Sequence, residues 1–454
     1  MTATITSPKE LRGPRLLPAL VRDPVDACTR AALAHGGLAR LRVGPVQVYV
    51  VSHPDFIRRV LVTNAGNYTK GRIMDGIRVA LGSGLFTADG ALWRRQRRLM
   101  QPAFAHTQRD HVASVTVEVW QRRMAGWETS RPIDLLAEFM GLNVEIILEV
   151  LFSTSIGPAK TRRLVDLSDA VFAGMAKQLP AFLLPAWVPV PGRTAYRQAV
   201  ADLGEEIDTI INDRRAEGPR GDLLDSLLGA RDPDSGETMS VEQVRDEICT
   251  LFMAGYESTA TSLVWTCYLL LAQHPYALNT LRAEVDRVLG GRVPAVSDLD
   301  QLPYLGQVMA EGLRLYPAFP MYFRSAVEAD QLGERPIPAG AQLIISPYAT
   351  HRDPDYWPNP EEFDPDRFSP QADGGARRTA YYPFGVGQRR CIGEPMALTI
   401  ALLSLSALVQ RFDLRLATDR PPRGRYAMTY QPRGGLPVSV TPRTAWSPGG
   451  IGGE

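Results

Sequence analysis

The sequence predicts a mainly helical protein with small β-sheets, an α+β architecture in one domain. Two short segments rich in β-branched residues, VQVYVV (46–51) and QLIIS (342–346), are predicted to be strands. Most other periodic segments have the spacing of helices. The 454 residues contain no internal repeat or long linker, and Gly and Pro punctuate many short connections. We expect a single domain over 1–454, with irregular tails at 1–20 and 444–454.

The strongest predicted helix runs from Val241 to Gln273. Ser240 and Gln243 have the spacing of a capping box at its start. Its second half, SLVWTCYLLLA, is apolar on almost every side, so we expect this helix to cross the middle of the protein. A further helix is predicted from Tyr304 to Leu315.

A polar segment, AGYESTATS (254–262), lies inside the central helix. Its hydroxyl groups have a plain explanation, since Ser and Thr can donate to the carbonyl four residues earlier. That explanation does not extend to Glu257, because an unpaired buried carboxylate costs several kcal/mol. The segment is therefore a candidate functional site, with ordinary helix packing as the alternative.

A second candidate is the segment PFGVGQRRCIGEP (383–395). Cys391 stands among glycines and next to two arginines, where a structural core cysteine usually has apolar neighbours. The segment is either a surface turn or a backbone loop that wraps a ligand-binding thiolate. The four cysteines show no C-x-x-C or metal-knuckle spacing, which favours a reduced, intracellular protein.

Composition and charge exclude several classes. A hydrophobic fraction of 45% and a charged fraction of 22% are ordinary for a globular protein. A formal net charge of +1 gives no support for a nucleic-acid partner. The N-terminal segment has neither an apolar run of about 20 residues nor the layout of a signal peptide. We expect no membrane anchor and a cytoplasmic location.

Five patterns then occur in a fixed order along the chain. They are W-x-x-x-R (93–97), A-G-x-E-S-T (254–259), E-x-x-R (311–314), F-D-P-D-R-F (363–368) and F-x-x-G-x-R-x-C-I-G (384–393). Together they resemble the cytochrome P450 family of haem-thiolate monooxygenases. The resemblance implies that haem b (iron protoporphyrin IX) binds between the long central helix and the cysteine loop.

The resemblance also assigns roles to single residues. Cys391 is implied to be the iron ligand, since a thiolate pushes electron density toward haem iron. The arginines suit the haem propionates, because a guanidinium fork matches a carboxylate. The implied cofactor contacts are Trp93, Arg97, Ala254, Gly255, Arg324, Phe384, Gly385, Arg389 and Gly393.

For catalysis the resemblance points to Glu257, Ser258 and Thr259. Glu257 and Ser258 are implied to relay protons through water to dioxygen, for which Gly255 leaves room. Ser258 departs from the family pattern, where threonine is usual, and its rotamer is less restricted than that of a β-branched residue. Glu311, Arg314 and Arg367 resemble the buried structural network of the family.

The resemblance further implies partners. We expect no fused reductase domain, so electrons from NAD(P)H would arrive through a separate ferredoxin and ferredoxin reductase. The segment RRQRR (94–98) either docks an acidic ferredoxin or is an ordinary solvated helix face. A monomer is expected.

The substrate is expected to be lipophilic, and a terpenoid of bacterial secondary metabolism is preferred. By resemblance, it would be surrounded by residues 66–85, residues 171–192 and the segment TYQPRGGLPVSV (429–440). A polyketide, macrolide or fatty acyl substrate is the alternative. A peroxygenase, an isomerase or a haem sensor is disfavoured, because none of them needs the acid–alcohol pair Glu257-Ser258.

Overall fold

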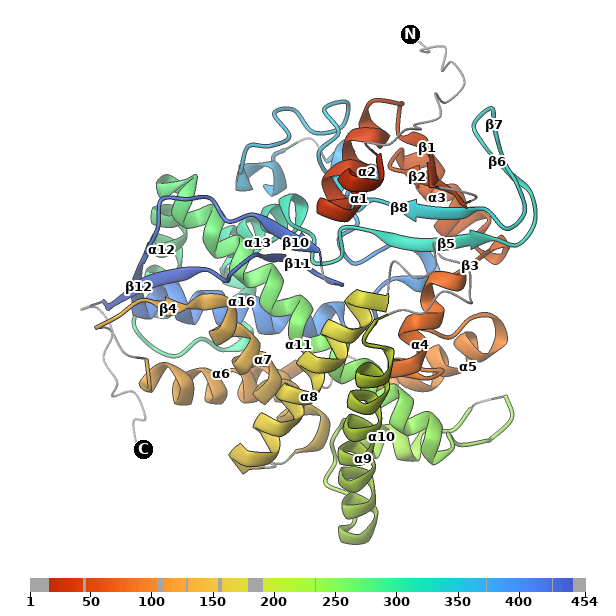
Figure 1. Ribbon diagram of the computed structural model, residues 1–454. Coiled ribbons are helices and arrows are strands. Elements are labelled where there is room, and N and C mark those ends of the chain that lie inside the picture. Colours follow the sequence, from red (N-terminus) through yellow and green to blue (C-terminus); the bar gives the residue numbers. More distant parts are fainter. Residues whose placement is uncertain are drawn as a thin grey trace.

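The fold joins a large helical part to a smaller part built around a five-stranded sheet (Figure 1). The computed structural model describes residues 16–43, 46–104, 109–127, 130–153, 157–178, 191–232, 234–372, 374–426 and 428–443. The α-helices are α1 (Leu16–Arg22), α2 (Pro24–Leu33), α3 (Pro54–Arg58), α4 (Asp75–Leu81), α5 (Gly90–Met100), α6 (Arg109–Ala125), α7 (Leu135–Phe152), α8 (Gly157–Gln178), α9 (Arg193–Glu217), α10 (Leu223–Gly229), α11 (Val241–Ala272), α12 (Pro275–Leu289), α13 (Pro303–Leu315), α14 (Pro347–Thr350), α15 (Gly375–Ala380) and α16 (Glu394–Arg411). The strands are β1 (Leu38–Val43), β2 (Val46–Val51), β3 (Tyr68–Thr69), β4 (Ile133–Asp134), β5 (Tyr322–Ala326), β6 (Asp330–Leu332), β7 (Arg335–Ile337), β8 (Gln342–Ile345), β9 (Phe412–Leu416), β10 (Gly424–Tyr426), β11 (Tyr430–Pro432) and β12 (Pro437–Pro442).

Helix α11 crosses the middle of the molecule, as its apolar second half predicts (Figure 1). The predicted capping box is present, because the Ser240 side chain accepts from the Gln243 N–H at 3.1 Å and the Gln243 side chain accepts from the Ser240 N–H at 3.0 Å. The helix packs against α7, α13 and α16, and residues 259–270 are all buried along it. The prediction for this helix is confirmed.

The five-stranded sheet has the strand order β1-β2-β8-β5-β3. The two strands expected from the sequence are neighbours in it, with Val48 beside Gln342 and Val51 beside Ile345 in a parallel pair. Smaller sheets are formed by β4-β12-β9, β10-β11 and β6-β7. The mainly helical fold class with small sheets is therefore confirmed.

Two hydrophobic clusters form the interior. The larger one fills the space between the helices, and the smaller one packs beneath the five-stranded sheet, with Leu343 and Ile345 among its members. Tyr382 belongs to the sheet cluster and Phe384 packs against the helical cluster. The segment that carries the cysteine loop therefore begins where the two clusters meet.

The N-terminal tail is shorter than expected. Helix α1 begins at Leu16, so residues 16–20, which were expected to be irregular, are helical. The physical reason is apolar burial, since α1 packs on α2 and Leu20 contacts the helical cluster. Residues 1–15 and the predicted tail 444–454 lie outside the described residues.

A buried ion pair ties α13 to the chain that follows α14. Arg314 donates from Nε and Nη2 to the two carboxylate oxygens of Glu311 at 2.6 and 2.8 Å. It also donates to the carbonyl groups of His351 and Pro360, both at 2.7 Å, while Arg367 lies 3.4 Å from Glu311. Glu311, Arg314 and Arg367 thus form the buried network that the sequence predicted.

Within the described residues, no helix has both the length and the apolar character needed to span a bilayer.

Candidate functional site

A cavity of about 300 Å³ separates α11 from the segment 383–393, which leads into α16. Side chains from α4, α5, α7 and the residues that follow α13 complete its walls. Most of these side chains are apolar. The cavity also brings together almost all of the residues that the sequence singled out, although they come from segments up to about 300 positions apart.

One face of α11 forms a wall of the cavity. Ala254, Gly255, Ser258 and Thr259 line it, followed by Ser262 one turn further along. These positions recur with the spacing of one helical face. The Ser258 hydroxyl donates to the Ala254 carbonyl at 2.7 Å, which is the plain packing arrangement considered for this segment.

Gly255 also permits close contact between α11 and α7. A Cβ atom at this position would lie 2.8 Å from Cδ1 of Ile147. A larger residue would require the Ile147 side chain to move, so close packing favours glycine here for a reason that is independent of any space for dioxygen.

The structure does not place Glu257 on the cavity wall. Its buried carboxylate accepts from the Thr429 hydroxyl at 2.8 Å and from the amide of Gln431 in β11. Residue 257 does not lie on the helical face that carries residues 254, 255, 258 and 259, so its side chain points in another direction. The expectation that Glu257 lies over the cavity beside Ser258 is corrected accordingly. Burial raises the pKa of Glu257 to about 7, an effect that the Thr429 hydrogen bond partly offsets.

The opposite wall is the cysteine loop. Gly385 and Gly387 have φ values of 77° and 74°, a backbone region that favours glycine. A side chain on Gly387 would also meet the carbonyl oxygen of Leu61. The loop closes through a hydrogen bond from the Cys391 N–H to the Phe384 carbonyl at 2.9 Å. The glycines therefore allow a tight turn that brings Cys391 and Phe384 to the cavity.

Cys391 differs from the other cysteines in its surroundings. Its exposed side chain faces the cavity, whereas Cys28, Cys249 and Cys267 are buried in the core with their pKa values raised to about 12 by burial. Burial among protein atoms raises the pKa of Cys391 too, but the N–H groups of Gly393 and Glu394 oppose this effect. They stand at the N-terminus of α16, where a helix favours negative charge.

Positive charge gathers along one side of the cavity, on Lys70, Arg97, Arg324 and Arg389, which we call the cationic rim. The Arg389 guanidinium lies 3.9 Å from the centroid of the Trp93 ring and donates to Asp89 Oδ1 at 2.7 Å. Asp89 is the carboxylate paired with the rim, which leaves an excess of positive charge.

Burial affects the charged state of the rim arginines. It lowers the pKa of Arg389 to about 10, although Asp89 opposes the shift, and it also lowers the pKa of Arg97 and Arg324. Arg97 Nη1 donates to the Arg390 carbonyl at 2.9 Å, and Arg324 Nη1 donates to the Phe323 carbonyl at 2.7 Å. Partly buried cations held this way favour an anionic ligand.

Sequence reasoning missed several residues of the site. Phe86 and Thr250 line the cavity outside every predicted stretch. Lys70 lies within the stretch 66–85 that was expected around the substrate, but its place in the cationic rim was not predicted. One signal was available, because the chain has only four lysines and one of them stands at position 70. Thr250 and Phe86 reach the cavity only through the packing of distant segments, so no local sequence pattern predicts their place in the site.

The regions expected around the substrate are reproduced in part. Met74, Ile77 and Leu85 line the cavity from the predicted stretch 66–85, and Met428 lines it immediately before the predicted stretch 429–440. No described residue of 429–440 or of 171–192 lines the cavity itself, and residues 179–190 lie outside the described residues.

The geometry fits one class of cofactor. A thiol supported by two backbone N–H groups faces apolar walls, and a cationic rim with an indole ring borders the same space. This donor set suits haem, a flat apolar macrocycle that carries two carboxylates at one edge. Fold and site together define a haem-thiolate protein.

The chain belongs to the cytochrome P450 family, whose sequence model matches residues 12–434. It is a cytochrome P450 monooxygenase, a class that uses haem and an external supply of electrons.

Individual relatives agree with this assignment. The chain is 38% identical over 405 residues to cyclooctatin synthase of Streptomyces melanosporofaciens, and the matched region covers 88% of each chain. It is 33% identical over 417 residues to pentalenene oxygenase of Streptomyces avermitilis, covering 90% of this chain and 91% of the relative. The crystal structure of the cytochrome P450DA heme domain superimposes with a TM-score of 0.86 at 29% identity, covering 96% of this chain and 98% of that chain.

Proposed function

We propose that this P450 oxygenates a cyclic terpenoid, using haem b ligated by Cys391 and electrons that pass from NAD(P)H through a ferredoxin reductase and a ferredoxin. The observation that carries the proposal is the cavity itself, in which Cys391 faces α11 across largely apolar walls. Relatives of this chain are named cyclooctatin synthase, cyclooctat-9-en-7-ol 5-monooxygenase and pentalenene oxygenase, and these names support a terpenoid as the substrate.

The residues that would hold haem b follow from the site. Cys391 supplies the sulfur ligand, and Phe384, Gly385 and Gly393 border it. The propionates would meet the cationic rim and the Trp93 indole. When bound, a thiolate-ligated haem activates dioxygen and favours cleavage of its O–O bond.

Protons are supplied from the α11 wall in this proposal. Ser258 and Thr259 line the cavity opposite Cys391, and each hydroxyl can both donate and accept a hydrogen bond. Release of the Ser258 hydroxyl from the Ala254 carbonyl would let it hold a water molecule and pass a proton to dioxygen. Glu257 acts as a positioning residue, since it anchors Thr429 and thereby Met428 on the adjacent wall.

Substrate selection is assigned to apolar side chains. Phe86, Leu251, Phe319 and Met428 line the cavity, where polar anchors are few. Such a pocket selects a substrate by its shape and buries its hydrocarbon surface. The favourable transfer free energy is roughly 25 cal/mol for each Å² of apolar surface removed from water. A cyclic hydrocarbon skeleton is suited to these walls.

The electron donor is proposed to approach from the cysteine side. Arg95 and Arg98 of the segment RRQRR form ion pairs with Asp232 of the same chain, and Arg97 lines the cavity. Arg94 is exposed at the same place and remains available to an acidic ferredoxin. The four unpaired cysteines support a cytoplasmic location, which belongs to the same proposal.

The test combines two absorption measurements on purified, haem-loaded protein. The reduced protein under carbon monoxide should give the spectrum of a thiolate ligand, and Cys391→His should lose it while retaining haem. Titration with cyclic terpenes should shift the spectrum as water is displaced, whereas fatty acids and macrolactones should not. Shifts with those other compounds alone would overturn the substrate class, and a wild-type spectrum without thiolate would overturn the role of Cys391.

A further inference from the structure

A segment without regular secondary structure, residues 82–88, forms part of the cavity wall. Leu85 and Phe86 line the cavity, and the Phe86 ring lies 6.4 Å from the ring of Phe319, which lines it too. The position of the Phe86 ring therefore sets the shape of the space available to a substrate.

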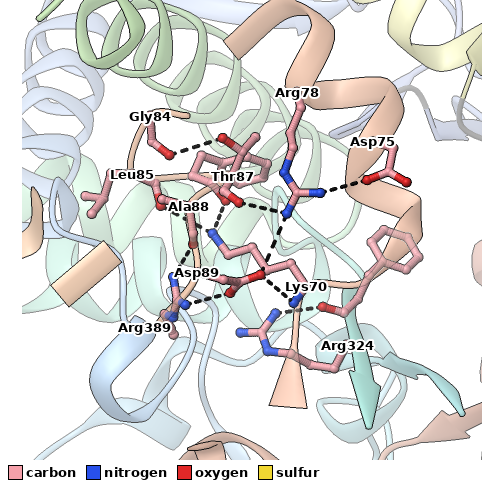
Figure 2. A network of polar contacts seen from close by, with 12 residues as sticks. Lys70, Asp75, Arg78, Gly84, Leu85, Thr87, Ala88, Asp89, Arg324 and Arg389 are labelled. Carbon is pink, nitrogen blue, oxygen red and sulfur yellow. Dashed lines mark hydrogen bonds and ion pairs between the residues drawn. The ribbon is translucent and has the colours of Figure 1, made fainter. Parts of the chain in front are cut away.

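Side chains from other elements hold the backbone of this segment. Asp246 and Glu247, on α11, accept from the N–H groups of Ser83 and Leu85 at 2.8 and 2.9 Å. Arginine side chains donate to two of its carbonyl oxygens (Figure 2): Arg78 to Thr87 at 3.2 Å and Arg389 to Ala88 at 2.8 Å. The Gln96 amide also donates to the Ser83 carbonyl at 2.8 Å. Backbone hydrogen bonds from Thr87 and Ala88 to the Gly84 carbonyl form a turn, and the side chains of other elements satisfy further backbone groups of the segment.

Lys70 holds the two residues that face the cavity. Its ammonium donates to the Leu85 carbonyl at 3.3 Å and to the Phe86 carbonyl, and it lies 5.2 Å from the centroid of the Phe86 ring. The side chain is only 8% exposed. Among the described residues, no carboxylate lies within ion-pair distance of this ammonium. Lys70 thereby binds the wall while facing the same cavity as Arg324 and Arg389.

A charged lysine at this position needs a nearby anion. Burial, followed by Arg389 and Arg324, lowers the pKa of Lys70 well below its ordinary value, and Asp89 only partly opposes them. The choice of lysine is itself unusual, because the chain has four lysines among 50 basic residues. Lys160 and Lys177, the other two that are described, are exposed on α8.

We propose that Lys70 is a positioning residue that couples the cationic rim to the cavity wall: an anion bound at the rim keeps Lys70 charged, and the charged ammonium fixes the carbonyl groups of Leu85 and Phe86. For the identity of that anion the inference rests on the proposed haem site, where the propionates occupy the rim. The charge on the haem propionates and the position of the Phe86 wall are then coupled through Lys70. Loss of charge on the propionates or on Lys70 makes the Phe86 backbone more mobile.

The test measures hydrogen exchange of the amides in 82–88 in four haem-loaded proteins: wild type, Lys70→Met, Lys70→Arg and the exposed control Lys160→Met. Each is prepared with haem b and with its dimethyl ester, which has no propionate charge. We expect Lys70→Met to accelerate exchange in this segment about tenfold or more, because hydrogen bonds to a charged donor are lost. Lys70→Arg retains protection, and Lys160→Met behaves as wild type.

The esterified haem tests the coupling. It should accelerate exchange of 82–88 in the wild type and have no further effect in Lys70→Met. The shape of the wall is tested with two ligands of different size, 4-phenylimidazole and imidazole. The ratio of their affinities should change by about fivefold in Lys70→Met, because only the larger ligand contacts the wall. A lysine that only stabilised the fold would lower haem content without altering this ratio.

Two outcomes overturn the inference. Unchanged exchange in Lys70→Met, or acceleration spread equally over α11 and α13, removes the positioning role. Unchanged exchange of wild type with esterified haem removes the coupling. The carbon monoxide spectrum reports the Cys391 ligand separately, so a failure of the proposed haem site is recognised independently, and the Lys70 variants still decide whether this residue holds the wall.

Discussion

At the scale of single residues, the buried carboxyl group of Glu257 has an energetic cost that depends on pH. Its pKa of about 7 lies above its ordinary value because burial disfavours the charge. Between about pH 4.5 and 7 the folded protein keeps a proton that the unfolded chain has lost. The contribution of Glu257 to stability therefore falls as pH rises through this interval and stays low above it.

Glu257→Gln is expected to remove this dependence. The variant should be more stable than wild type above pH 7, by about 1–3 kcal/mol, and the difference should vanish toward pH 4.5. Thermal unfolding of both proteins from pH 4.5 to 8.5 measures it. Glu242→Gln, an exposed change on the same helix, is the control. Parallel pH profiles for wild type and Glu257→Gln would show that the folded carboxyl is ionised throughout.

Ser258 provides a prediction about catalysis. Ser258→Ala removes a hydroxyl from the wall opposite Cys391, so product formed per NAD(P)H consumed should fall roughly tenfold while NAD(P)H consumption continues. The control is Ser262→Ala, because Ser262 lines the same wall and makes the same type of bond, to the Ser258 carbonyl at 2.9 Å. Full product yield from Ser258→Ala would exclude it from proton delivery.

At the scale of elements, the cysteine loop depends on backbone that only glycine adopts readily. Gly387→Ala would impose both a positive φ and a contact with the Leu61 carbonyl, so we expect a loss of about 2–4 kcal/mol in stability and weaker retention of haem. Gly434→Ala is a matched control, since Gly434 has a φ of 87° but open space around its Cα, and it should cost about 1 kcal/mol. Urea denaturation and haem release rates measure both. Equal losses in the two variants would mean that the Leu61 contact is unimportant.

The elements also show what the sequence could predict. Helix α11 was predictable because its capping box and apolar run are local signals, and the cysteine loop because its glycines, arginines and cysteine stand together. The segment 82–88 was not, since its conformation is fixed by Asp246 and Glu247, about 160 positions away. The direction of Glu257 was readable from helical spacing alone, but the motif as a whole suggested a shared role with Ser258.

At the scale of the whole molecule, the cysteine loop packs against both the sheet cluster and the helical cluster. Tyr382 and Val386 pack with the sheet cluster, while Phe384 and Ile392 pack with the helical cluster. Tyr322, from β5, donates to the Pro383 carbonyl at 3.0 Å and fastens the same segment to the sheet. Because the cysteine loop contacts both clusters, its geometry depends on their correct relative placement. His351 links the loop's start to the buried ion pair, since its Nε2 accepts from the Tyr382 N–H at 3.1 Å and its Nδ1 lies 3.1 Å from the Arg314 carbonyl oxygen.

The distribution of charge decides where an electron donor can bind. The chain is nearly neutral, with a net charge of +1, so no general attraction guides an acidic partner. Near the cysteine, Arg95 and Arg98 are paired with Asp232, and Arg390 is paired with Glu394. Arg94 is exposed on α5, and the structure gives it no ion pair with any described residue. It also lies near enough to act electrostatically on Arg389.

Arg94→Glu should therefore slow reduction by a ferredoxin about three- to tenfold at low ionic strength, with the difference shrinking as salt is added. Stopped-flow reduction of substrate-bound protein from 20 to about 500 mM salt would measure this effect, with haem content confirming an intact site. Arg197→Glu makes the same charge change at an exposed position of α9, and it separates local docking from net charge. If both variants slow reduction equally, net charge alone is responsible. If neither does, the donor binds away from α5, because a docking contact at Arg94 would make the association rate sensitive to this one charge.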